Sequence, residues 1–193
     1  MTSAHAYTLF ETALGRCGIA WSERGVAMLC LPEPSSSATE RRMRRRFPEA
    51  VGSVASMPTK AAIDAIVALL SGEPRDLLEV ELDMRGVPDF QQRVYVAARQ
   101  ILPGRTLTYG EVARRLGVPG AARAVGQALG RNPFAVIVPC HRVLAAGGNV
   151  GGFSANGGAA TKLRMLAIEG VRLPSRAEPT QLGSAQPGLF DRR

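Results

Sequence analysis

The sequence changes character around Gly86-Val87-Pro88, and this change limits what the chain can fold into. Before these residues, short runs of mixed apolar and polar residues alternate with turn residues, which is typical of antiparallel strands. After them, apolar residues recur at helical spacing. The pattern predicts a mixed α/β (α+β) protein in three parts: a small α/β domain over residues 1–88, a mostly helical domain over residues 89–173 and a disordered tail over residues 174–193.

The first domain contains the strand-like runs. Three strands are expected over residues 6–14, 17–22 and 26–31, as an antiparallel meander. Beyond a turn-rich connector over residues 32–37, the pattern predicts helices over residues 40–47 and 59–71 and a half-buried strand over residues 77–84. The helix over residues 40–47 carries five arginines, which indicate either a solvated helix face or phosphate contacts: Arg41, Arg42, Arg44, Arg45 and Arg46.

The second domain contains two helix-start signals. Asp89 with Gln92, and Thr108 with Glu111, have the spacing of a capping box, in which each side chain hydrogen-bonds the backbone N–H of its partner. After the second signal, a helix over residues 109–116, a turn over 117–120 and a helix over 121–130 are expected. This order is the signature of a helix-turn-helix.

The second helix of this pair has mostly small residues and one long side chain near its start, Arg123. Reading base edges in the major groove requires several Arg, Asn or Gln side chains on one face. A small-residue face with one arginine suits close approach to a narrow groove and insertion of one side chain. It equally suits a helix packed against a neighbour with Arg123 on the surface, and the residues alone leave both interpretations open.

Positive charge is concentrated in the second domain. Residues 89–173 contain 11 Lys+Arg and 3 Asp+Glu, a net of +8, whereas residues 1–88 contain 10 and 11, a net of −1. This distribution favours a polyanionic partner such as nucleic acid for the second domain.

The cysteines and the apolar runs limit the compartment. Cys17, Cys30 and Cys140 form no disulfide framework and suit a reducing cytosol. No run has transmembrane length and no signal peptide is recognised, so a cytoplasmic protein without membrane contact is expected. His5 could share a metal with Cys17 and Cys30, but the spacing matches no compact zinc site, and we expect no metal.

Cys140 follows the point where a β-branched run, Ile137-Val138, meets Pro139. Because proline has no N–H for a strand ladder, we expect a buried strand to end there and to hold Cys140 rigidly, as suits a nucleophile. A buried structural cysteine is the alternative for this residue alone. Further on, residues 147–158 contain six glycines, which suit either close backbone approach to a flat ligand or ordinary hairpin loops.

Pro139-Cys140-His141-Arg142-Val143, in this setting, resembles the O6-alkylguanine-DNA alkyltransferases. Five further stretches occur in the order found in that family: Thr108-Tyr109-Gly110, Ala122-Arg123-Ala124-Val125-Gly126, Arg131-Asn132-Pro133, Gly152-Phe153-Ser154, and Lys162 with Glu169-Gly170. The similarity covers residues 89–172, and residues 1–88 resemble the family only in architecture. The resemblance implies a ribonuclease-H-like first domain and a winged-helix-like second domain.

The resemblance also implies an activity. In this family, an alkyl group on O6 of guanine in double-stranded DNA is transferred once, irreversibly and without a cofactor, to a cysteine of the protein, here Cys140; O4-methylthymine is a second expected substrate. His141 would hold a relay water and Glu169 would orient the histidine, which has the logic of a catalytic triad. Asn132 would tie the cysteine turn to the preceding helix, and Tyr109 would press on the target phosphate and donate a proton to the purine.

The remaining expected contacts concern the extruded base. Arg123 would fill the space that the base leaves, with Ala122 beside it on the DNA-binding helix. The backbone carbonyls of Cys140 and Val143 would accept hydrogen bonds from the guanine amine. Ser154 would hydrogen-bond O6, and Phe153 would form an apolar wall where some relatives have tyrosine.

Three other functions are alternatives: a non-catalytic sensor of alkylated DNA, a helix-turn-helix regulator and a thiol hydrolase. The sensors lack the cysteine, and a hydrolase lacks an independent base here. A monomer is expected. Gln186-Pro187-Gly188-Leu189-Phe190 in the tail is close to the pattern with which bacterial proteins bind the sliding clamp, which suggests Gln186, Leu189 and Phe190 as a second partner site. Folding of Leu189 and Phe190 back onto the protein, or a chance match, is the alternative.

Overall fold

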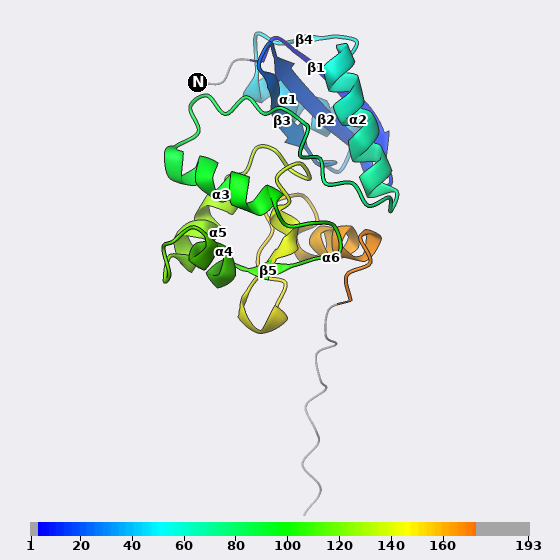
Figure 1. The fold of residues 1–193 in the computed structure, drawn as a ribbon. Coiled ribbons are helices and arrows are strands. Elements are labelled where there is room, and N and C mark those ends of the chain that lie inside the picture. The colour runs from blue at the N-terminus through cyan, green and yellow to red at the C-terminus, as the bar shows by residue number, and fades with distance from the viewer. Residues whose placement is uncertain (1–3, 173–193) are drawn as a thin grey trace, which may run out of the picture.

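The computed structural model describes residues 4–172 and has the mixed α/β fold expected from the sequence, with a small sheet at one end and a group of helices at the other (Figure 1). The sheet part contains β1 (Ala6–Thr12), β2 (Gly15–Ser22), β3 (Gly25–Cys30), α1 (Ser36–Arg46), β4 (Val51–Gly52) and α2 (Met57–Leu70). The helical part contains α3 (Asp89–Arg99), β5 (Leu107–Thr108), α4 (Tyr109–Arg115), α5 (Ala122–Gly130), the 3₁₀ helix η1 (Cys140–Arg142), β6 (Val143–Leu144), the 3₁₀ helix η2 (Ala146–Gly148) and α6 (Gly158–Ile168).

The sheet has the strand order β3-β2-β1-β4. The two hairpins of β1, β2 and β3 are antiparallel, which confirms the predicted meander, and β4 pairs in parallel with β1. Alternate residues face opposite sides, as the two-residue period of a strand requires. Ala20 and Met28 pack with α1, whereas Ile19 and Leu29 join a core that also contains α2 and the helical part. The two helices therefore cover opposite faces of the sheet.

The helix α1 begins four residues earlier than predicted. Ser35 is its N-cap and its hydroxyl accepts a hydrogen bond from Ala38 N at 3.2 Å, so Ser36 and Ser37 belong to the helix rather than to a connector. Met43 and Phe47 bury the apolar face of this segment under the sheet. Its arginines lie on the remaining faces.

The strand predicted over residues 77–84 was wrong. The alternation predicted Leu78 on the buried side, but Leu78 is exposed, and Leu77 is buried instead with φ 57°, which is not a strand conformation. Only Leu82 pairs with the sheet, through an isolated parallel bridge to Val26. The carbonyls of Leu77, Leu78 and Val80 instead accept hydrogen bonds at 2.8 Å from one nitrogen of Arg99 in α3. A guanidinium from a distant helix thus satisfies backbone groups that a neighbouring strand was expected to satisfy.

One of the two predicted capping boxes forms. Thr108 Oγ1 accepts from Glu111 N at 3.2 Å and Thr108 N donates to Glu111 Oε2 at 2.6 Å. The prediction for Asp89 was wrong, because Pro88 is the N-cap of α3 and makes no side-chain cap. Gln92 instead donates through its amide to the carbonyl of Val87, at 2.7 Å.

The expected helix–turn–helix order is present in α4 and α5, which pack against each other. Next to them, β5 pairs in parallel with β6, so that Leu107 is opposite Val143 and Thr108 is opposite Leu144. This pairing brings the start of α4 close to the segment that follows Cys140, although more than thirty positions separate them in the sequence.

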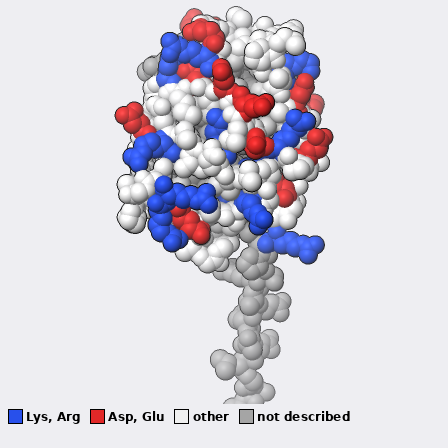
Figure 2. All heavy atoms as spheres, in the orientation of Figure 1, with Lys and Arg blue, Asp and Glu red and all other residues white. Residues whose placement is uncertain are grey.

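Carboxylates are unevenly distributed over the surface. On the face that Figure 2 shows, most Asp and Glu side chains lie over the upper part, where the sheet is, and few lie over the helical part below. Among residues 4–172, no helix combines the length and the apolar character that crossing a membrane requires.

Candidate active site

Cys140 follows a buried turn rather than the predicted strand. Residues 135–137 form the turn, and Val136 has φ 69°, which no strand contains. Val136, Ile137 and Val138 are all buried in the core, at 2 % exposure or less. Burial explains why this run consists of apolar, β-branched residues. A buried strand would contain the same residue types, so the sequence alone could not distinguish the turn from a strand. Pro139 ends the turn and Cys140 begins η1.

Asn132 holds this turn in place with both ends of its amide. Its nitrogen donates to the carbonyl of Val138 at 2.9 Å, and its oxygen accepts from the N–H of Phe134 at 2.9 Å. Asn132 lies two residues after the end of α5. One side chain therefore connects the end of the helix to the backbone just before Cys140, as the resemblance implied.

A buried charged cluster lies behind Cys140. His141 Nε2 is 3.0 Å from Glu169 Oε1, and Arg142 donates to both oxygens of the same carboxylate, at 2.9 and 2.8 Å. All three side chains are at most 2 % exposed. Arg142 also donates to the carbonyl of Ile101, which follows α3. Such a fork-shaped pairing fixes the position of a carboxylate better than a single hydrogen bond can.

The protonation states of this cluster follow from its contacts. Burial opposes ionisation of Glu169, but the hydrogen bonds from His141 and Arg142 outweigh it and lower the pKa of the carboxyl to about 2. Burial lowers the pKa of His141 below that of free imidazole, despite its bond to Glu169. A neutral His141 beside an ionised carboxylate carries its proton on Nε2. Nδ1, which is buried and has no hydrogen-bond partner among residues 4–172, is then the basic ring atom.

Cys140 itself is a thiol at rest. Burial raises the pKa of Cys140, although hydrogen bonding from Asn132 and the charge of Lys162 act in the opposite direction. The residue is only partly buried and lines a cavity, so a reactant can reach it. A thiol in this state needs a base to become a nucleophile.

Lys162 lies close to the candidate site, although the sequence interpretation gave it no role. It is fully buried in α6, donates to the carbonyl of Val143 at 2.7 Å and lies 5.9 Å from the centre of the Tyr109 ring. In the sequence, it is a lysine on an otherwise apolar face of the last helix and one of the residues that carry the family resemblance. Arg142 was missed for a similar reason, because its sequence neighbours do not reveal Glu169 as its partner.

The DNA-facing candidates lie on α4 and α5. Tyr109 is the first residue of α4 and is half-buried, and burial raises its pKa. A Cβ on Gly126 would lie 3.8 Å from its ring, so α5 packs closely against it. Arg123 is exposed near the start of α5, and no hydrogen bond or ion pair joins it to another residue in the range 4–172. Ala122 precedes it as the first residue of the helix.

The groups expected to contact the base differ in how available they are. The carbonyl of Val143 already accepts from Lys162, and the carbonyl of Cys140 accepts from the N–H of Val143, so each has one lone pair left. Phe153 is partly buried and packs against the core, and Ser154 is exposed. Both line a cavity of about 360 Å³ together with Cys140 and Asn132.

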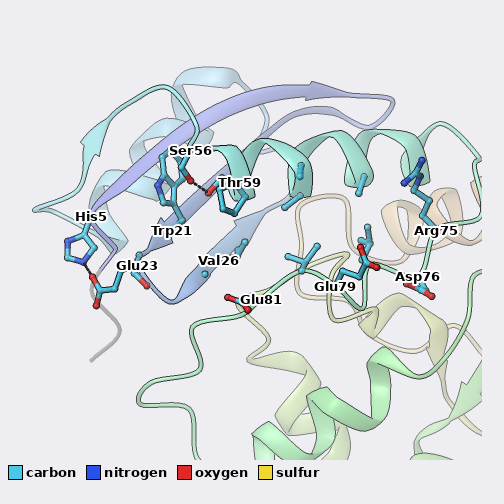
Figure 3. Close-up of a pocket in the computed structure, with 18 of the residues that line it drawn as sticks. His5, Trp21, Glu23, Val26, Ser56, Thr59, Arg75, Asp76, Glu79 and Glu81 are labelled. Atoms are coloured by element: carbon cyan, nitrogen blue, oxygen red, sulfur yellow. Dashed lines mark hydrogen bonds and ion pairs between the residues drawn. The ribbon is translucent and has the colours of Figure 1, made fainter.

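A second and larger cavity lies in the sheet part, and Figure 3 shows the residues around it. Its volume is about 1190 Å³. Small residues of α2, with Trp21 and Val26, form apolar walls, and five carboxylates line it: Glu23, Glu73, Asp76, Glu79 and Glu81. It contains no cysteine, and its histidine, His5, is paired with Glu23 at 2.7 Å. Volume alone would therefore indicate the wrong cavity for nucleophilic chemistry.

No group of three or more His, Cys, Asp or Glu side chains that could hold a metal ion occurs among residues 4–172. His5, which could have joined Cys17 and Cys30 in such a site, lies with Glu23 instead.

Comparison with known proteins gives consistent results. A family model described as the DNA-binding domain of 6-O-methylguanine DNA methyltransferase matches residues 89–171. The methylated-DNA–protein-cysteine methyltransferase of Mycobacterium tuberculosis is 49% identical over 114 residues, which is 59% of this chain and 67% of the relative. The protein of the same name from Methanothermobacter thermautotrophicus is 36% identical over 156 residues, 81% of this chain and 80% of the relative.

Solved structures agree with these sequence matches. The crystal structure of Mycobacterium tuberculosis OGT in complex with DNA has a TM-score of 0.70 and 37% identity, and the match covers 88% of this chain and 96% of the other. The O6-methylguanine-DNA methyltransferase of the archaeon Pyrococcus kodakaraensis has a TM-score of 0.66 and 26% identity, over 86% of this chain and 99% of the other.

Proposed function

This chain belongs to the O6-methylguanine-DNA methyltransferase family, which repairs alkylated DNA by direct transfer of the alkyl group to the protein, and we propose that Cys140 is the acceptor. The observation that supports this assignment is a reachable thiol whose neighbour in the chain, His141, is buried and paired with Glu169. Cys17 and Cys30 are buried, and burial raises their pKa values to about 12 and about 11.

The proposed chemistry is an in-line displacement. The Cys140 proton passes through a relay water to Nδ1 of His141, and Glu169 stabilises the imidazolium that forms. The thiolate attacks the alkyl carbon, a C–S bond forms, and the O6–C bond breaks with its electron pair moving to O6 of guanine. A proton from Tyr109 or from the relay ends on the purine ring. Because the thioether is stable, each molecule reacts once and no cofactor is needed.

We propose that the base reaches Cys140 by leaving the duplex, because Cys140 is partly buried in the lining of a cavity and a stacked base could not enter it. Arg123, which has no partner within the described part of the chain, would fill the space left by the base, and Ala122 would allow close approach of α5 to the DNA. Tyr109 would press on the target phosphate, Val143 and Cys140 would bind the guanine amine, and Ser154 and Phe153 would contact the base. O4-methylthymine is a further proposed substrate.

We assign DNA binding and catalysis to residues 89–173, with residues 1–88 as a separate α/β domain. The family match over residues 89–171 and the location of the cysteine, histidine and glutamate within that range support this division. The protein would act as a monomer in the cytoplasm, where reducing conditions keep Cys140 a free thiol. The alternatives of a non-catalytic sensor, a regulator or a thiol hydrolase are not favoured by relatives that are methyltransferases.

The acceptor is tested by incubating the full chain with duplex DNA containing one O6-methylguanine and mapping the modified peptide by mass spectrometry. One added methyl group is expected on the peptide containing Cys140 and none on those containing Cys17 or Cys30. A methyl group on either of the other cysteines, with Cys140 unmodified, would overturn the assignment.

A sliding clamp is proposed as a second partner through Gln186, Leu189 and Phe190, which lie outside the described residues. Two adjacent apolar side chains could enter an apolar cleft while the glutamine amide binds backbone groups at its edge. A peptide of residues 180–193 should bind a bacterial clamp with modest affinity, because ordering a chain segment opposes binding. If the Leu189→Ala/Phe190→Ala peptide binds equally well, the proposal fails.

A further inference from the structure

The larger cavity, in the sheet part, combines apolar walls with exposed carboxylates. It lies between α2 and the segment over residues 73–81, with Trp21 and Val26 of the sheet beside it (Figure 3). We call it the acidic cavity, because five carboxylates line it. Its volume of about 1190 Å³ exceeds the roughly 300–1,000 Å³ of pockets that enclose a drug-sized ligand, so several side chains fit inside.

Two of the five carboxylates are available to a ligand. Glu23, Glu73 and Asp76 already have partners, and the two basic residues of the lining are the partners of Glu23 and Glu73. Glu79 and Glu81 are exposed, and within residues 4–172 neither side chain makes a hydrogen bond or an ion pair. The acidic cavity therefore favours an occupant that is both apolar and positively charged.

The chain leaves the described range close to this cavity. A Cβ on Gly72, the residue before Glu73, would lie 3.7 Å from the carbonyl of Ile168 at the end of α6. The end of α2 thus lies against the end of α6 (Figure 1). Beyond Arg172, the sixteen residues 173–188 span at most about 55 Å when fully extended, far more than the distance across a cavity of this volume.

The segment over residues 189–193, which lies outside the described residues, has the chemistry that the acidic cavity favours. Leu189 and Phe190 are adjacent large apolar residues, and Arg192 and Arg193 follow one position later. Asp191 is the one acidic residue of the segment, so its net charge is positive. The order of the residues places an apolar pair next to a basic pair, and the cavity offers apolar walls next to two free carboxylates.

We propose that residues 189–193 bind in the acidic cavity of the same molecule. Leu189 and Phe190 pack against its apolar walls, and the two arginines pair with Glu79 and Glu81, since a guanidinium binds a carboxylate through two parallel hydrogen bonds. The tether keeps the segment at a high effective concentration, so modest contacts suffice. The clamp proposed above would use the same two apolar side chains, so the cavity and a clamp bind the segment one at a time.

Trp21 reports on the occupant, because it is the one tryptophan of the chain and lines the cavity. Quenching of its fluorescence by acrylamide is measured in the full chain, with wild type and with Leu189→Ala/Phe190→Ala. The matched control is Leu173→Ala/Leu182→Ala, which removes two large apolar side chains that lie outside the segment but also beyond the described residues. None of these positions belongs to the proposed active site, so the proposal is tested independently of alkyl transfer.

The quenching constant should rise about twofold or more in Leu189→Ala/Phe190→Ala, because a segment tethered at roughly millimolar effective concentration fills the cavity at least half of the time. It should stay unchanged in the control and rise by a smaller factor in Glu79→Gln/Glu81→Gln, where the apolar contacts remain. Equal constants in wild type and in Leu189→Ala/Phe190→Ala, or an equal rise in the control, would overturn the proposal. Protection of the tryptophan that increases with protein concentration would also overturn it and assign the cavity to the segment of a second copy.

Discussion

The two cavities of this protein both include residues of β3 but are opposite in chemical character. The cavity in the sheet part is about three times as large and is lined by five carboxylates, whereas the cavity beside Cys140 is lined by four arginines and no carboxylate. A polyanion such as DNA is repelled by the first and attracted by the second. With Cys140 as the proposed acceptor, charge and a reachable nucleophile, rather than volume, mark the reactive cavity.

The sharpest form of this comparison uses two cysteines that line the same basic cavity, Cys30 and Cys140. Cys140→Ser should lower the rate of alkyl transfer by more than about a thousandfold, because a hydroxyl without a strong base is a poor nucleophile. Binding to alkylated DNA should change little. Cys30→Ala, in contrast, should keep nearly full transfer in a labelled-methyl assay. If Cys140→Ser still accepted methyl groups at a comparable rate, the location of the reactive site would be wrong.

The next largest loss of repair rate is expected for an arginine of the helical part, and an arginine of the sheet part is its control. Arg123→Ala should slow repair of duplex DNA by about 10- to 100-fold, since a few kcal/mol are needed to hold a base outside the stack. Reaction with free O6-benzylguanine should be nearly unchanged, because no base has to leave a duplex. Arg75→Ala, at the acidic cavity, should leave both rates as they are. Equal losses of Arg123→Ala on both substrates would mean that Arg123 supports the fold.

Acid should destabilise the two parts through different carboxylates. The pKa of Glu169 is about 2 in the folded protein against 4.5 for a free glutamate, so its stabilisation is complete above pH 4.5 and is lost as pH falls toward 2. This corresponds to about 3 kcal/mol in the free energy of unfolding. Asp83, whose pKa is lowered to about 2 by Arg85 and Ser22, acts in the same direction in the sheet part with a smaller shift.

Chemical unfolding between pH 6 and pH 2 measures these contributions. Glu169→Gln should be less stable than wild type at pH 6 but should lose less of its remaining stability on acidification. Asp83→Asn should show the same behaviour to a lesser degree. A Glu169→Gln variant as sensitive to acid as wild type would show that the Glu169 carboxylate is not the group that titrates.

The smallest effect is expected at the acidic cavity. Glu79→Gln/Glu81→Gln removes two negative charges there and should change the rate of transfer from duplex DNA by less than about twofold, because salt largely screens distant exposed charges. Both the rate and its salt dependence are measured in parallel with wild type. A loss of transfer rate as large as the one expected for Arg123→Ala would show that the acidic cavity also contributes to the reaction with DNA.

Local signals predicted much of the fold. The meander of β1 to β3 was confirmed because the separating residues, Gly15 and Gly25, adopt φ values of 116° and 121° that only glycine tolerates easily. The box of Thr108 and Glu111 was confirmed because both partners lie within one helical turn. Each of these signals depends on neighbours in the sequence.

The failures depended on partners far away in the sequence. Residues 77–84 were predicted as a strand because the alternation cannot reveal that Arg99, some twenty positions later, binds their carbonyls. Ile137 and Val138 were predicted to end a buried strand because burial selects the same β-branched residues in a turn. Arg142 and Lys162 received no role because their partners, Glu169 and the carbonyl of Val143, are 27 and 19 positions away.

The outer edge of β3, which no further strand of the sheet covers, has a consequence for dividing this protein into fragments. Its backbone pairs with Glu81 and Asp83 at one end and with Pro133 at the other, where Leu29 N donates at 2.9 Å. A fragment ending at residue 88 would keep the first contacts but expose the N–H of Leu29 beside apolar side chains. Unpaired edge strands of this kind recruit other chains, so such a fragment should self-associate in solution. In the intact protein, the amide hydrogen of Leu29 should exchange with solvent only when the segment around Pro133 unfolds or separates from β3.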